Sequence, residues 1–193
     1  MTKLFFSIFI LFSLSNLYSC SPSGVLASGG ATTMVVAEGD RTLGTVVDDA
    51  TIKINISTNL LSSSTNLFVN INTNVIEGRV LLTGIVDTQE IRIEAVRKVW
   101  EVDGVREVIN EIEIGSKTTI KEYANDLWIT TQVKGLAAKT IGLRALSYNF
   151  ETIKGKVYIA GITSRPEQLD QIVEATKTIK GVKEIVNYVI IKE

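Results

Sequence analysis

Few side chains in this 193-residue sequence have the type and spacing that catalysis needs. It contains no histidine and a single cysteine, Cys20, which excludes His/Cys metal clusters and every catalytic triad with an imidazole base. The acidic pair Asp48 and Asp49 fits a helix N-cap better than an acid–base pair. No glycine-rich phosphate-binding motif occurs. The sequence therefore predicts a protein that is not an enzyme and that needs no cofactor and no metal.

Cys20 is the one residue with a clear covalent role. It follows Lys3 and the apolar run LFFSIFILFSLSNLYS, which together have the form of a secretory signal peptide, predicted at residues 1–19. The ending LYSC resembles a bacterial lipobox, in which the cysteine becomes the first mature residue and carries lipid. That resemblance implies lipid attachment, such as palmitate, at Cys20, and Ser21 matches the outer-membrane sorting pattern. The alternative is an ordinary cleavage site that leaves Cys20 unmodified.

A second candidate for function is the stretch NDLWITTQVKGLAAK. It is predicted to be a helix that opens at Asp126 as its N-cap and packs an apolar stripe on the core. That stripe comprises Ile129, Val133 and Leu136. Trp128 lies about 100° away from it around the helix. An indole on a partly wet face, with a cation nearby, suits a membrane interface; packing against the rest of the chain is the alternative.

These residues sit in a chain that is predicted to consist of two repeats. A shift of 77 residues aligns matching glycine, acidic and core-type positions. The aligned pairs include Asp49 with Asp126, Gly78 with Gly155, Gly84 with Gly161, Gly104 with Gly181 and Asn110 with Asn187. The predicted parts after the signal peptide are a lipidated flexible tether at 20–44, a first domain at 45–115, a linker at 116–124 and a second domain at 125–193.

Each repeat has the pattern of an α-β-β-α-β unit. The first helices are predicted to open at Asp49 and Asp126, and the first strands to lie near 68–75 and 146–153. A glycine turn leads to the second strands, RVLLTGIV and KVYIAGIT. The second helices, near 89–102 and 167–179, are predicted to end at Gly104 and Gly181, before the last strands. This predicts an α+β fold of two tandem domains, each a three-stranded sheet with two helices on one face.

The repeat resembles the BON domain, a small module of bacterial envelope proteins. The residues that carry the resemblance are Gly84 and Gly161 in the hairpins, and the segments DGVREVIN and KGVKEIVN. With the lipobox and the tether, nearly the whole mature chain resembles the dual-BON outer-membrane lipoproteins. In that family the first helix of the second BON domain contacts phospholipid, and Trp128 and Lys134 match its aromatic and basic positions. The resemblance also implies a role in outer-membrane integrity, with a link to the barrel-assembly machinery and to the division site.

Charge differs between the two repeats. Residues 45–115 carry six basic and eleven acidic side chains, whereas residues 125–193 carry ten basic and seven acidic ones. A basic second domain fits an anionic partner, with random drift on solvated faces as the alternative, and export by the signal peptide favours phospholipid over nucleic acid. The residues predicted to bind phospholipid are Trp128, Lys134, Leu136 and Lys139. Trp100 is instead predicted to pack at the edge of a core or between domains.

Three hypotheses for function remain. The leading one is a lipid-anchored, periplasm-facing outer-membrane protein whose second domain binds anionic phospholipid. The alternative is a periplasmic protein–protein adaptor without specific lipid recognition. A third is a soluble, stress-induced periplasmic BON protein, which requires that Cys20 is not acylated.

Overall fold

The computed structural model describes residues 41–116 and 118–192. Cys20, the predicted signal peptide and the predicted tether up to residue 40 lie outside the described residues. The first repeat contains α3 (Leu43–Ser63), α4 (Thr65–Asn70), β1 (Ile71–Ile76), β2 (Arg79–Val86), α5 (Gln89–Trp100) and β3 (Glu107–Ile114). The second contains α6 (Ile120–Ile141), the 3-10 helix η3 (Gly142–Ser147), β4 (Tyr148–Ile153), β5 (Lys156–Thr163), α7 (Pro166–Lys177) and β6 (Glu184–Ile191).

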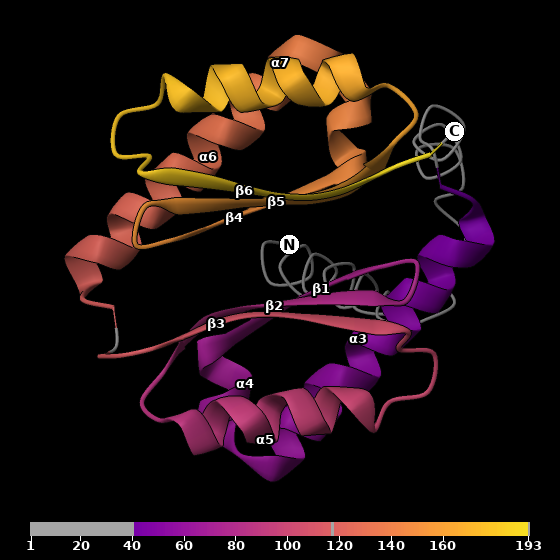
Figure 1. Cartoon of the computed structure of the whole chain (residues 1–193), viewed down its shortest axis with the longest axis vertical. Helices are drawn as coiled ribbons and strands as arrows, with labels where there is room; N and C mark the ends of the chain where they lie inside the picture. The colour runs from indigo at the N-terminus through magenta and orange to yellow at the C-terminus, as the bar shows by residue number, and fades with distance from the viewer. Residues whose placement is uncertain (1–40, 117, 193) are drawn as a thin grey trace, which may run out of the picture. The chain divides into compact units, whose positions relative to one another are not determined.

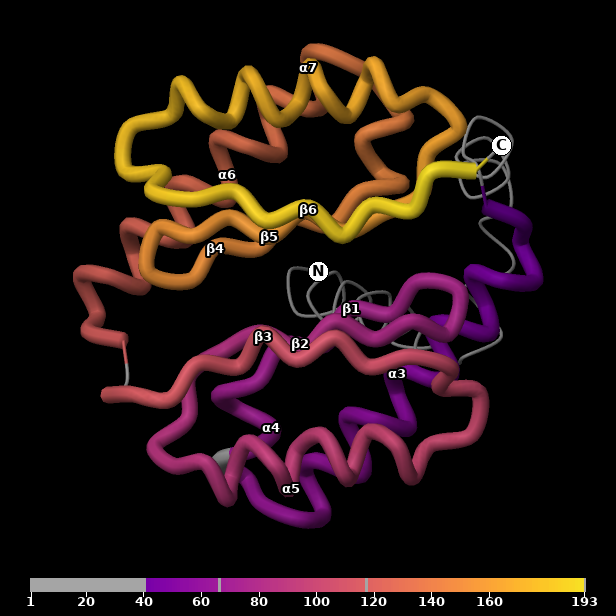
Figure 2. Tube along the Cα trace, in the orientation of Figure 1, coloured from indigo at the N-terminus to yellow at the C-terminus, as the bar shows by residue number. Residues whose placement is uncertain are grey.

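Each repeat forms its own mixed sheet of three strands. In the first sheet β2 pairs antiparallel with β1 and parallel with β3, and β5 pairs in the same way with β4 and β6. The antiparallel pairs are joined by tight turns, whereas the parallel pairs need the crossovers that α5 and α7 supply. The two long helices of each repeat, α3 and α5 or α6 and α7, lie on one face of its sheet (Figure 1), and the two Cα traces follow similar paths (Figure 2). The predicted α+β fold, with two helices over each sheet, is confirmed.

The two cores lie between each sheet and its helices. In the first repeat Ile52, Ile56 and Leu60 are buried, as the spacing predicted. In α6 the buried stripe continues instead through four-residue steps, so that Ala137 takes the core position and Leu136 is only partly buried. The prediction of Leu136 as a core residue was therefore wrong.

The first helices begin earlier than predicted, and Asp49 and Asp126 are not their N-caps. Thr42 caps α3, and Thr119 caps α6 in a capping box with Glu122. Residues 120–124, predicted as linker, are thus part of α6. Apolar residues precede each aspartate at helical spacing, so each helix extends back to the nearest threonine cap.

Short helical segments replace the predicted beginnings of the first strands. The apolar residues around Phe68 and Leu146 are typical of strands, but they lie in α4 and η3, and the strands begin at Ile71 and Tyr148. The second strands have the predicted bounds. The second helices end in caps at Glu101 and Thr178, before the glycines predicted to end them. Gly104 and Gly181 occupy the following loops with positive φ values of 90° and 98°.

The sheet faces that carry no helices share a third apolar cluster. It is formed by Ile76, Leu81, Tyr158, Ala160 and Ile162. At its border Lys156 pairs with Glu111 at 3.4 Å, and Tyr188 donates a hydrogen bond to the same carboxylate. Burial and the Glu111 carboxylate raise the pKa of Tyr188 to about 12. Strands β2 and β5 are consequently covered on both faces, which explains their nearly continuous burial.

Candidate functional site on helix α6

The first half of α6 exposes four large apolar side chains. They are Ile120, Tyr123, Leu127 and Trp128, which are 89%, 63%, 55% and 47% exposed. We call this set the α6 patch. Ile129 and Val133 of the same helix fill the core, and none of the four belongs to it. Exposed apolar residues that gather in this way are typical of a binding surface.

Basic residues surround the beginning of α6. Lys121 is exposed in the first turn of the helix. The β4–β5 turn, which is hydrogen-bonded to α6 through Asp126, carries Lys154, and the side chain of Lys183 lies against Gly155 of that turn. Hydrogen bonds from Thr119, and to a smaller extent these two lysines, lower the pKa of the Glu122 carboxyl. The beginning of α6 thus has both the α6 patch and cations close to it.

Asp126 positions one of these cations. Its carboxylate is 6% exposed and accepts hydrogen bonds from the backbone N–H groups of Lys154 at 2.7 Å and Gly155 at 2.8 Å. Lys154 has a φ of 49°, in the left-handed region that non-glycine residues seldom adopt. The buried aspartate thus holds the β4–β5 turn in the conformation that brings Lys154 next to α6.

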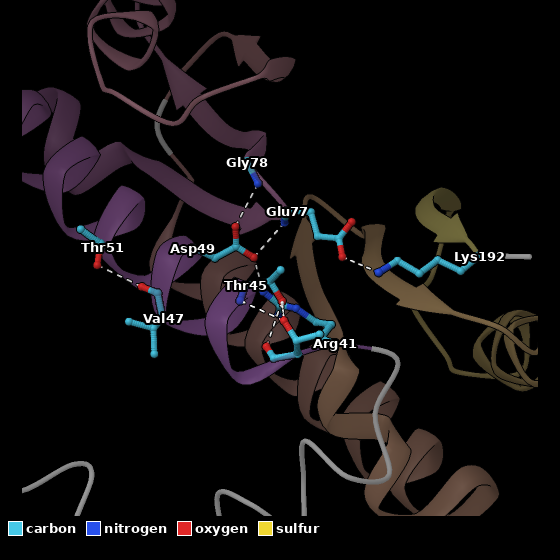
Figure 3. A network of polar contacts seen from close by, with 9 residues as sticks. Arg41, Thr45, Val47, Asp49, Thr51, Glu77, Gly78 and Lys192 are labelled. Carbon is cyan, nitrogen blue, oxygen red and sulfur yellow. Dashed lines mark hydrogen bonds and ion pairs between the residues drawn. The ribbon is translucent and has the colours of Figure 1, made fainter.

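The first repeat contains the same device. The Asp49 carboxylate accepts hydrogen bonds from the backbone N–H groups of Glu77 at 2.8 Å and Gly78 at 2.9 Å, and it also pairs with Arg41 (Figure 3). Glu77 in turn pairs with Lys192 (Figure 3). The aspartates of the repeat are therefore turn clamps inside helices, not caps.

The structure brings some of the predicted lipid-binding residues together and separates others. Trp128 is exposed, and Lys139 lies within about 20° of it around the helix, three turns further along. Lys134 is exposed but lies about 120° away from Trp128, on the side of α6 where it acts on Glu151. Leu136 is partly buried. Lys134 thus lies apart from Trp128 but lines the same hollow as Ile120, Tyr123 and Leu127, whereas Leu136 belongs to neither set.

Several residues of the surface were missed because the helix was predicted to begin at Asp126. Ile120, Lys121 and Tyr123 were assigned to a linker, although the spacing of Thr119 and Glu122 is that of a capping box. Trp100 was predicted to be packed, but it is 51% exposed at the end of α5, and that prediction was wrong. At the position of Trp128, the first repeat has Thr51, whose hydroxyl donates to the Val47 carbonyl at 3.0 Å.

The described residues contain no group of three or more His, Cys, Asp or Glu side chains arranged to hold a metal ion. Within 41–116 and 118–192, no helix combines the length and the apolar content that crossing a membrane requires. The features that remain are an exposed apolar patch and its cations.

Comparison with known sequences agrees with the repeat. The sequence model of the BON domain matches residues 48–116 and 125–193. The chain belongs to the BON domain family. It is 37% identical to an uncharacterized protein in the gshII 5′ region of Anaplasma centrale, over 76% of this chain and 96% of that protein.

Two further relatives have more informative names. The chain is 29% identical to the outer membrane lipoprotein DolP of Haemophilus influenzae, over 82% of both chains. It is 31% identical to a 21 kDa hemolysin of Actinobacillus pleuropneumoniae, over 77% of this chain and 78% of that one. Both similarities extend over more than three quarters of this chain, and neither the family nor the DolP name refers to a catalytic activity.

Proposed function

We propose that this BON protein is a non-enzymatic, lipid-anchored protein of the outer membrane, facing the periplasm, and that its second domain binds anionic phospholipid through the α6 patch. The observation that carries the proposal is the exposed group of Ile120, Tyr123, Leu127 and Trp128 beside Lys121. Similarity to a relative named an outer membrane lipoprotein supports the location. Cys20 would provide the covalent anchor, and upkeep of envelope integrity would be the biological role.

The energetics favour an interfacial contact rather than insertion of a whole helix. Apolar side chains contribute about 25 cal/mol for each Å² removed from water, and the indole of Trp128 suits the boundary between headgroups and acyl chains. Each well-placed cation adds about 1 kcal/mol near an anionic bilayer, an effect that fades within about 8 Å at physiological salt. Lys121, Lys154 and Lys183 would therefore select anionic lipid, while the patch supplies the hydrophobic contact.

Co-sedimentation with vesicles tests the proposal. The chain from Ser21 onward, without lipid, would be mixed with vesicles of graded anionic phospholipid content, because an isolated second domain would expose its share of the third apolar cluster. Trp128→Glu is the test variant, and Trp100→Glu is its matched control, since the two indoles are 47% and 51% exposed. We expect binding that needs anionic lipid, weakens as salt rises, and is lost in the first variant alone.

Two results would contradict the proposal. If the folded chain binds no vesicle, or if both tryptophan variants bind equally well, the α6 patch is a protein-docking surface and the adaptor hypothesis takes its place. A second measurement uses Trp100→Phe, which leaves Trp128 as the only tryptophan of the chain. Its fluorescence should shift to shorter wavelength with anionic vesicles. The anchor is tested separately, by the mass of the mature N-terminal peptide that contains Cys20.

A further inference from the structure

Helix α3 of the first domain carries an apolar stripe on its outer side. It is formed by residues at successive steps of four, three, four, three and four: Leu43, Val47, Ala50, Ile54, Ser57 and Leu61. We call this stripe the α3 seam. Its four large members, Leu43, Val47, Ile54 and Leu61, are 47%, 53%, 65% and 50% exposed. Figure 3 shows Val47 and Asp49 on different sides of α3, with Asp49 directed to the β1–β2 turn. The seam is thus separate from the face that packs on the sheet.

The spacing of the seam is that of a helix-pairing surface. Its five steps span 18 residues, and their alternation between four and three residues is that of the a and d positions of a coiled coil. Polar uncharged residues such as Thr51 and Thr58 lie beside it, and Lys53 is the only basic residue of the helix. Interfacial membrane helices usually carry several Lys or Arg residues on their polar side, and this domain has an excess of acidic residues. The seam therefore fits another helix better than an anionic bilayer.

We propose that the α3 seam pairs with the α3 seam of a second copy of this chain, in antiparallel orientation. If Leu43 of one copy lies opposite Leu61 of the other, Leu61 of the first copy also lies opposite Leu43 of the second. Every contact along the helix pair then occurs twice, so the pairing has two-fold symmetry. Val47 then faces Ser57, and Ala50 faces Ile54. Each large β-branched side chain meets a small one, as interdigitating layers require. The stripe is complementary to itself in this register, which is the condition for a symmetric dimer.

A shallow groove lies along the same surface. Its volume is about 430 Å³, and small side chains, Ala50 and Ser57, form part of its lining. The other lining residues are Lys53, Ile54, Thr58, Leu61 and Phe68. In the antiparallel register, the small side chains leave room for the larger ones of the partner copy. The groove lies entirely within the first domain, so the site needs no residue from the second.

The second repeat shows that the seam is not a requirement of the fold. At the shift of 77 residues Ile54 corresponds to Thr131, and Ser57 corresponds to Lys134. A pairing of this kind through α6 would place a lysine inside the seam, where an unpaired charge is costly to bury. The two repeats have thus diverged on the same side of the same helix: the residues of the α3 seam are uncharged, with Lys53 at the border of its groove, whereas α6 has its patch and its cations.

The contact expected from one helix pair is small. Interfaces that bury less than about 1,200 Å² are weak or transient in solution. Attachment to a membrane raises the effective concentration of two copies, so the dimer should form at the membrane and dissociate on dilution in detergent. This places the experiment in membranes that contain the full-length protein.

Cysteine cross-linking tests the pairing and its register. Two differently tagged full-length chains, one with Val47→Cys and one with Ser57→Cys, would be produced together and their membranes oxidised. A disulfide should join the two different chains. Two Val47→Cys chains should not cross-link, because those positions lie about 15 Å apart along the paired helices, beyond the Cα separation of about 7 Å that a disulfide spans. A chain with only Cys20 gives the background from the native cysteine.

A second pair of variants separates a real interface from chance collision. Ile54→Lys should lower the yield of the Val47–Ser57 cross-link at least fivefold. Ile93→Lys, on α5, should leave it unchanged, since the two isoleucines are 65% and 58% exposed. Circular dichroism checks that both variants fold.

Other occupants of the seam would give different results, and each of them overturns the proposal. Cross-linking of Val47→Cys to itself means a parallel pair. A second outcome is that no cross-link forms and that nitroxide-labelled lipid quenches a fluorophore at position 54 but not one at position 93. This result means that the seam lies on the membrane. Folded chains that give neither signal mean that two copies do not pair through α3.

Discussion

Replacing Asp126 by asparagine should destabilise the second domain, although asparagine is as good an N-cap as aspartate. The structure places Asp126 inside α6, where each carboxylate oxygen accepts one backbone N–H, at 2.7 and 2.8 Å from Lys154 and Gly155. Asparagine retains one acceptor oxygen and directs an NH₂ group at the other N–H. The change therefore breaks one hydrogen bond and sets two donors against each other.

The expected size follows from the hydrogen bonds. A hydrogen bond to a charged group contributes about 1.5–3 kcal/mol, so Asp126→Asn should lower the free energy of unfolding by about 2 kcal/mol. Asp126→Ala loses both acceptors and should cost about 3–4 kcal/mol. For a domain of this size, 1 kcal/mol shifts Tm by about 4–8 °C, so the asparagine variant should melt about 8–15 °C lower.

Thermal unfolding followed by circular dichroism measures this effect on the chain from Ser21. Asp170→Asn, at an exposed position of α7, is the matched control and should leave Tm unchanged. Amide hydrogen exchange should also become faster at Lys154 and Gly155 in the Asp126 variant. A Tm within 1–2 °C of the wild type, with slow exchange at both amides, would mean that the carboxylate does not clamp the turn and that the geometry derived for Lys154 is wrong.

Three further predictions concern single positions. Gly135→Ala should raise the free energy of unfolding in urea by about 0.5–1 kcal/mol, because a methyl group inside α6 would meet no atom within 4 Å. Gly84→Ala should lower Tm strongly, because its Cβ would lie 2.1 Å from the Asn70 carbonyl oxygen at a φ of 137°, whereas Gly44→Ala, with space around it, should not. Burial raises the pKa of Glu151, so its ionisation opposes folding; Glu151→Gln should therefore raise Tm at pH 7 and lose that advantage near pH 4.

Much of the fold could be predicted because repeated patterns carry it. The two hairpins, the bounds of β2 and β5, and the burial of Ile52 and Ile129 follow from local periodicity that occurs twice at a constant shift. The beginnings of the helices could not be placed in the same way, because an aspartate near the beginning of a helix can make two different sets of hydrogen bonds. As an N-cap it binds the N–H groups of its own helix, but here it binds those of a turn 28 and 29 residues away. Only the three-dimensional structure distinguishes the two.

The error in the helix start also explains what was missed in the candidate site. The identity of Trp128 as an exposed aromatic was predicted from its angle to the core stripe, because that angle depends only on the helical repeat. The partners of Trp128 depend on where the helix begins and on which turn packs beside it. Ile120 lies in the first five residues of α6, which were assigned to a linker, and Lys154 reaches α6 through a contact that is distant in sequence.

The two repeats separate what the fold requires from what function adds. Both domains keep the buried aspartate, the turn it holds and the core stripe of the first helix. The exposed side chains of that helix lie outside the two cores, so mutations there change binding without the cost of a cavity. On this side α3 has an uncharged stripe at heptad spacing, whereas α6 has an aromatic and apolar patch among cations. Because the constraint is the same in both, this difference is the strongest indication that the two domains bind different partners.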